Sequence, residues 1–219
     1  MTQSGFYLKQ IEVGPMENFA YLLGDLATHQ VILVDPAWEV DRLIKAAEAE
    51  DLEIVGALIS HHHRDHTNGI EDLLNYKNCP IYIHKQDQEF VPIPKSNIHS
   101  TQDGESIKVG QFNIQFIHTP GHTPGSQCFL VNDHLVTGDT LFIDGCGRCD
   151  LPGGDPEAMY YTLTQKILLL PEAIQIMPGH NYAALPHSSL KEQKLSNPYL
   201  RLATESLKDF TKFRMRPRQ

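Results

Sequence analysis

The stretch SHHHRDHTNG, residues 60–69, places four histidines and an aspartate within six consecutive positions. It directly follows the apolar run IVGALI, residues 54–59, which has the length and composition of a buried strand. Imidazole nitrogens together with a carboxylate suit zinc, iron or manganese at neutral pH. The mixed ligand set predicts an open, reactive metal site at a strand end rather than a closed structural one.

The spacing within this motif indicates how the ligands are shared. Alternate side chains of an extended backbone lie on one face, so His61 and His63 can point together while His62 points away. Asp65 and His66 belong to the following turn, from which they can approach a neighbouring point. One segment can therefore contribute to two metal sites.

Three more candidate ligands lie far along the chain, each where an apolar run meets a turn. Rigid scaffolds normally present binding groups at such positions. With the first motif they make five histidines and two aspartates, enough for two adjacent metal ions. The added residues are His122 in TPGHTPGS, Asp139 in TGDTLF and His180 in PGHNY.

The surrounding sequence alternates between strand and helix patterns in two similar blocks. In the first block, strands are expected at 6–13, 19–25, 30–36, 53–60 and 80–84, with helices at 39–50 and 67–78. In the second, strands are expected at 105–110, 112–119, 126–131, 134–139 and 173–180, with a helix at 155–170. Two such blocks predict an α/β fold, an αβ/βα sandwich of two mixed sheets packed face to face with helices outside.

We expect a single domain over residues 1–219 with a short C-terminal helical extension at about 188–213. The proline-containing segment 85–104 is expected to be a surface excursion.

Composition narrows the classes of function. The chain has 219 residues, is 41% hydrophobic and 21% charged, and carries a formal charge of −9, which argues against a nucleic-acid partner. The N-terminus shows no signal pattern, and no apolar run is long enough for a bilayer. We expect a soluble cytoplasmic protein, monomer or homodimer, with no membrane partner. Cys146 and Cys149 form a C-x-x-C that we interpret as ordinary loop residues.

The ordered motifs HHHRDH, TPGHTPGS, TGDTLF and PGHNY resemble those of the metallo-β-lactamase superfamily, in particular its glyoxalase II (hydroxyacylglutathione hydrolase) branch. The resemblance extends over residues 33–200. It implies that Asp35, in LVDP, orients the metal-binding loop and that Asp139 bridges two metal ions. The implied ligands of one ion are His61, His63 and His122, and those of the other are Asp65, His66 and His180.

A hydroxide bridging two metal ions is a strong nucleophile near neutral pH, so hydrolysis is the expected reaction. We expect two divalent ions of zinc, iron or manganese, Asp65 and Asp139 as the catalytic carboxylates, and a glutathione-type thioester as substrate. The turn GRCDL also resembles that of persulfide dioxygenases, which use a single iron. In that alternative His61, His122 and Asp139 would hold the iron, and glutathione persulfide would be oxidised. A metal-binding protein without catalysis is disfavoured because no ligand is missing.

The resemblance also implies two substrate-binding residues. Arg148 stands where glyoxalase II enzymes have a lysine for the glycine carboxylate of glutathione, and Tyr182 matches a tyrosine near the glutathione backbone. Cys149 and Asp150 depart from the aromatic pair of those enzymes. Only 39 residues follow His180, so we expect two short helices and a more open site. The remaining histidines are interpreted as surface or satisfied polar residues: His29, His62, His84, His99, His118, His134 and His187.

Overall fold

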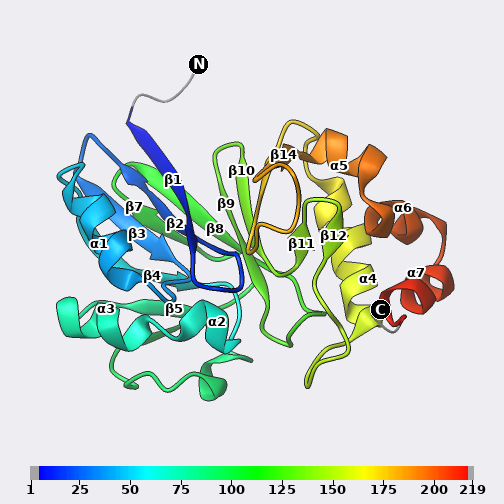
Figure 1. The fold of residues 1–219 in the computed structure, drawn as a ribbon, viewed down its shortest axis with the longest axis horizontal. Coiled ribbons are helices and arrows are strands. Elements are labelled where there is room, and N and C mark those ends of the chain that lie inside the picture. The colour runs from blue at the N-terminus through cyan, green and yellow to red at the C-terminus, as the bar shows by residue number, and fades with distance from the viewer. Residues whose placement is uncertain (1–4, 217–219) are drawn as a thin grey trace.

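The first half of the chain forms a six-stranded mixed sheet in a computed structural model that describes residues 5–216 (Figure 1). Its strands follow the order of the chain, antiparallel from β1 to β3 and parallel from β3 to β6. They are β1 Phe6–Val13, β2 Asn18–Asp25, β3 Gln30–Val34, β4 Glu53–Ile59, β5 Ile81–His84 and β6 Ile98–Thr101. The parallel part leaves the carboxyl ends of β3, β4 and β5 at one edge.

Helices cover the outer face of this sheet. In α1, Val40–Glu48, the apolar residues at helical spacing are the buried ones, Leu43 and Ala47 among them. The helix α3, Ile70–Tyr76, buries Ile70 and Leu73 in the same way. A single helical turn, α2 Arg64–Thr67, carries part of the histidine motif between β4 and α3.

The second half forms another six-stranded sheet, in the order β14-β13-β10-β9-β8-β7. Only β10 and β13 pair in parallel, and the other neighbours are antiparallel. The strands are β7 Ser106–Val109, β8 Phe112–His118, β9 Gln127–Val131, β10 His134–Gly138, β13 Gln175–Pro178 and β14 Ser188–Ser189. A short hairpin, β11 Leu141–Phe142 and β12 Gly145–Cys146, follows β10.

The outer face of the second sheet is covered by α4, Pro156–Gln165, and by the C-terminal helices (Figure 1). Asp155 caps α4 by accepting from the amides of Glu157 and Ala158. A core between the two sheets includes Tyr21, Phe116 and Phe129, all nearly fully buried. The predicted αβ/βα sandwich of two mixed sheets is confirmed.

Two expectations about the chain were incomplete. The segment 85–104 is not only a surface excursion: it contains the 3₁₀ turn η1, Gln88–Phe90, and the edge strand β6, which pairs in parallel with β5. The strand β6 forms because it pairs with β5, since its own sequence shows little alternation of apolar and polar residues.

The expectation of two short C-terminal helices was also wrong, because the structure has three. They are α5 Leu190–Ser196, α6 Pro198–Glu205 and α7 Leu207–Arg214. Asn197 and Ser206 each cap the following helix and so divide the segment once more than expected. No helix in residues 5–216 is long and apolar enough to cross a membrane.

Candidate metal centre

The predicted ligands come together at the edge where the two sheets meet. The motif 61–66 follows β4, the His122 loop joins β8 to β9, Asp139 follows β10 and His180 follows β13. Backbone hydrogen bonds join the sheets there: the Gln127 amide donates to the Ser60 carbonyl at 2.8 Å. The same edge thus receives loops from both halves of the chain.

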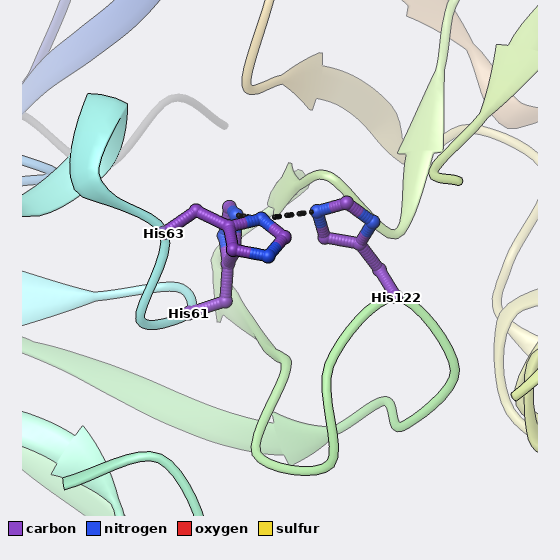
Figure 2. Close-up of side chains that lie close together, drawn as sticks. All are labelled: His61, His63 and His122. Atoms are coloured by element: carbon purple, nitrogen blue, oxygen red, sulfur yellow. Dashed lines mark hydrogen bonds between the residues drawn. The ribbon is translucent and has the colours of Figure 1, made fainter. Parts of the chain in front are cut away.

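The first cluster consists of three histidines. Nδ1 of His63 lies 3.1 Å from Nε2 of His61 and 2.9 Å from Nε2 of His122. Figure 2 shows His61 and His63 entering from one segment and His122 from the facing loop, with the ring nitrogens meeting between them. Their ligand atoms all lie within 4.8 Å of one another, which is the spacing of donors around a shared cation.

The second cluster consists of Asp65, His66 and His180, whose ligand atoms also lie within 4.8 Å of one another. Nε2 of His66 lies 3.2 Å from Nε2 of His180 and 3.3 Å from Oδ2 of Asp65. Asn18, in β2, donates from its amide to Asp65 Oδ2 at 2.9 Å. Sequence reasoning did not find Asn18, since nothing in its local pattern marks it.

Asp139 lies between the clusters. Its Oδ1 is 3.3 Å from Nε2 of His66 and 3.4 Å from Nε2 of His180, while its Oδ2 is 3.3 Å from Nε2 of His122. Oδ1 is buried and has no hydrogen-bond partner among residues 5–216. A buried carboxylate oxygen without a donor is costly unless a cation occupies its place, so Asp139 fits a ligand shared by two ions.

Hydrogen bonds on the far side of the rings decide which nitrogen faces the centre. Nδ1 of His122 lies 2.7 Å from the Arg148 carbonyl, and Nδ1 of His180 lies 2.9 Å from the Met16 carbonyl. A carbonyl only accepts, so both Nδ1 atoms carry the proton and both Nε2 atoms present a lone pair to the centre.

Asp35 orients the rings of His61 and His66 in the same way. Its carboxylate accepts from the Ser60 amide at 2.7 Å and from the Ser60 hydroxyl at 2.6 Å. The Ser60 oxygen then accepts from Nδ1 of His61 at 2.9 Å, and Asp35 itself accepts from Nδ1 of His66 at 3.0 Å. Asp35 has a positive φ of 49°, a conformation that aspartate and asparagine tolerate better than most residues.

The electrostatics of the clusters call for positive charge. Burial holds the pKa of His61 well below its ordinary value and lowers that of His63 to about 4, so both rings are neutral at pH 7. Burial opposes charge on His66 too, but Asp139 and the other nearby carboxylates raise its pKa well above the ordinary value. A metal ion would supply the positive charge that a proton on His66 otherwise supplies. The donor set and its charge therefore fit divalent metal ions.

A further buried carboxylate, Asp87, holds the two sides of the first cluster together. It accepts from the His62 amide at 2.9 Å, from the Thr123 hydroxyl at 2.7 Å and from the Gly125 amide at 2.7 Å. His62 Nδ1 also lies 2.9 Å from Asp87 Oδ2. Asp87 was missed because it lies in the segment taken for a surface excursion. Its place three residues beyond the end of β5 was the available signal.

The two predicted substrate-binding residues flank the centre. Arg148 forms a bidentate ion pair with Asp150, from Nε at 2.9 Å and from Nη2 at 2.8 Å. Tyr182 stacks on His180 with ring centroids 4.5 Å apart. Gly147 packs so closely under Asp139 that a Cβ would lie 1.8 Å from the Asp139 carbonyl oxygen, so this turn can approach the centre only with glycine there. Among residues 5–216 the groups that could hold a metal include neither Cys146 nor Cys149.

The sequence profile of the Metallo-beta-lactamase superfamily matches residues 13–180. The chain belongs to this superfamily. The match includes all seven predicted ligands and the Asp35–Ser60 pair. Family membership and the His/Asp clusters together identify a metal-dependent enzyme of the metallo-beta-lactamase superfamily.

Relatives within the superfamily differ in their named activities. The probable polyketide biosynthesis zinc-dependent hydrolase BaeB of Bacillus velezensis is 32% identical over 92% of this chain and 89% of its own length. The mitochondrial persulfide dioxygenase ETHE1 of Bos taurus is 35% identical over 86% of this chain and 73% of its own. Hydroxyacylglutathione hydrolase GloC of Haemophilus influenzae is 32% identical over 77% of this chain and 86% of its own length.

Solved structures of the superfamily show the same fold. ETHE1 from Myxococcus xanthus superposes with a TM-score of 0.86 at 30% identity and covers 97% of this chain and 92% of its own. TTHA1623, described in a di-iron-bound form, has a TM-score of 0.74 at 27% identity, and the match covers 87% of this chain and 99% of TTHA1623.

Proposed function

We propose that the protein is a metal-dependent hydrolase of a glutathione-type thioester. The observation that carries the proposal is the pair of complete ligand clusters with Asp139 in contact with both. When bound there, divalent metal ions would supply an activated water and polarise the carbonyl that it attacks. Zinc, iron and manganese all suit the nitrogen and oxygen donors.

The protein's own residues hold this arrangement rigid. The carbonyls of Arg148 and Met16 orient two histidines, and Asp35 with Ser60 orients two more. Burial of His61, His66 and His122 keeps bulk water away from the centre and strengthens electrostatic interactions there. Burial opposes charge on Asp65 and Asp139, but His66 holds the pKa of both below the ordinary range, so both remain carboxylates at neutral pH and can serve as ligands of a cation.

The relatives support a hydrolase without naming one substrate. BaeB is named a zinc-dependent hydrolase and GloC a hydroxyacylglutathione hydrolase, and the chain spans most of both. Arg148 and Tyr182 remain the proposed contacts for the glutathione part. To take a substrate carboxylate, Arg148 would have to exchange its ion pair with Asp150. Both side chains of that pair are about two-fifths exposed. Exposed ion pairs stabilise a protein by only about 0–1 kcal/mol, so breaking this one costs little free energy.

A second candidate is an iron-dependent persulfide dioxygenase. The likeness to Myxococcus xanthus ETHE1 over nearly the whole chain favours it. The complete second cluster of Asp65, His66 and His180 favours the hydrolase, since a single-iron enzyme has no need of three further ligands.

Purified protein separates the two functions. We expect about two equivalents of metal by elemental analysis, release of free thiol from a glutathione thioester, and loss of that activity on chelation. Oxygen uptake with glutathione persulfide, one equivalent of iron and no thioester hydrolysis would reject the hydrolase in favour of the dioxygenase. Full thioester turnover by rigorously metal-free protein would reject both.

A further inference from the structure

Arg214, at the end of α7, is a buried cation beside the metal centre. Only 6% of its surface is exposed. It lines a cavity of about 410 Å³ together with Phe142, Tyr182 and Tyr199. A buried guanidinium is stable only when its charge and its donors are matched by partners, so its surroundings indicate what the cavity can bind.

Within the described residues, Arg214 has hydrogen-bond partners for only some of its donors. Nη1 donates to the Tyr199 hydroxyl at 3.0 Å, and the guanidinium lies 5.4 Å from the centroid of the same ring. Within residues 5–216 the buried Nε has no hydrogen-bond partner and no carboxylate forms an ion pair with Arg214. The guanidinium also interacts with the side chain of Cys149.

The nearby acidic groups are engaged elsewhere. Asp150 gives both carboxylate oxygens to Arg148, and Asp144, which also lines the cavity, accepts from the Ser196 hydroxyl. Burial raises the pKa of the neighbouring Cys149 thiol to about 12, so that thiol is uncharged at neutral pH. No described carboxylate therefore forms an ion pair with Arg214, although Asp150, whose pKa Arg148 lowers, lies near enough for the Arg214 charge to lower that pKa further.

The cavity shares its wall with the metal centre. The ring of Tyr182 stacks on the ligand His180, and Phe142 packs edge-on against both, with centroids 5.7 Å from His180 and 5.4 Å from Tyr182. A ligand in the cavity thus lies one aromatic layer from the clusters. A substrate could react at the centre while its other end reaches Arg214.

We propose that this cavity binds an anionic group of the substrate's thiol carrier other than the carboxylate assigned to Arg148, a carboxylate or a phosphate, with Arg214 as its charge partner. The identification of the ligand as a thiol carrier rests on the proposed thioester hydrolysis. The binding of an anion at Arg214 rests only on the unmatched guanidinium and the cavity. The planar fork of arginine suits both anions, and Tyr199 holds it in place.

The test compares Arg214→Met and Arg214→Lys with Arg201→Met, which removes the same charge from an exposed position on α6. The substrates are S-acetylglutathione, acetyl-coenzyme A and the uncharged S-acetyl-N-acetylcysteamine. We expect Arg214→Met to reduce the preference in kcat/KM for an anionic over the uncharged thioester by roughly 10- to 100-fold, mainly through KM. Arg214→Lys should recover part of it, and Arg201→Met should retain all of it.

The two anionic substrates distinguish the source of the charge. Loss confined to S-acetylglutathione identifies a carboxylate, and loss confined to acetyl-coenzyme A identifies a phosphate. Equal losses on all three substrates, with a lowered melting temperature, would overturn the proposal and leave Arg214 a structural residue. If Arg214→Met does not fold, Arg214→Lys decides by the same preference ratio.

A binding measurement keeps this proposal separate from the proposed function. Calorimetric titration with S-methylglutathione and with 4′-phosphopantetheine requires no hydrolysis. Binding of either that weakens at least tenfold in Arg214→Met, by the same charged hydrogen bonding, supports the anion site even if the wild-type protein cleaves no thioester. Binding of neither, or binding equal in wild type and variant, overturns it.

Discussion

Asp35 Oδ2 accepts from Nδ1 of His66 at 3.0 Å, and the same carboxylate reaches His61 through the Ser60 hydroxyl. One residue outside both clusters therefore orients a ring in each. We predict that Asp35→Asn, which tolerates the positive φ, lowers metal affinity by roughly 10- to 100-fold. Competition against a chelator measures it, with the exposed Asp41→Asn on α1 as the control. Unchanged affinity in Asp35→Asn would contradict this role.

His180→Ala distinguishes one metal ion from two. It deletes a ligand of the second cluster and the stacking partner of Tyr182. We expect the metal content to fall from two equivalents to one. We expect kcat to fall by more than the roughly 10- to 100-fold that is typical when a residue hydrogen-bonded to a metal ligand is replaced. The exposed His187→Ala should change neither. A His180→Ala protein that keeps two metal ions and full hydrolysis would show the ligand assignment to be wrong.

Asp87→Asn tests the link between the two loops of the first cluster. An amide nitrogen in place of one carboxylate oxygen would face the donors of His62, Thr123 or Gly125. We predict a loss of about 2–4 kcal/mol in the free energy of unfolding, with weaker metal binding. Denaturant titration and metal competition measure both. Glu89→Gln, exposed on the same 3₁₀ turn, removes an equal charge and should be neutral.

Arg148→Ala tests the predicted carboxylate contact. We expect KM for a glutathione thioester to rise by roughly 10- to 100-fold with little change in kcat. Arg148→Lys should recover only part, since an ammonium cannot make the bidentate contact. Asp150→Asn is the matched variant, because it frees the Arg148 fork and should not raise KM. Equal losses for uncharged thioesters would show instead that Arg148 only supports the loop that orients His122.

His84 predicts a pH dependence of stability. It is buried and stacks on His118 at 4.0 Å, and burial, followed by the charge of His118, lowers its pKa to about 4. Between pH 6.5 and 4 the unfolded state binds a proton that the folded state does not, so stability falls as the pH falls through this range.

Replacing His84 with Phe keeps a ring and removes the titration. From pH 7.5 to pH 5 we expect the metal-free wild type to lose about 1–2 kcal/mol more stability than His84→Phe. The metal-site histidines are the same in both proteins, so the difference between them reports His84 together with its interaction with His118. Denaturant unfolding at the two pH values measures it, and parallel losses in the two proteins would refute the assignment.

The sequence by itself determined the features that follow from local periodicity and order. Alternating apolar residues marked the strands, helical spacing marked α1, and the motif after β4 indicated a metal centre. These signals are readable because strand and helix repeats depend on residues a few positions apart. The sandwich of two sheets followed from two similar blocks of strands and helices, and the family followed from four short motifs in their order.

Only the tertiary structure decided which distant groups complete the site. Asn18 meets Asp65 across 47 positions, and Asp87 meets Thr123 across 36. Arg214 lines a cavity with residues of the β11–β12 hairpin because α7 packs on α4 and α6. Such contacts leave no periodic trace, because they arise from how packed elements bring separate segments to one point, and a polar residue looks alike in sequence whether packing buries it or leaves it in water.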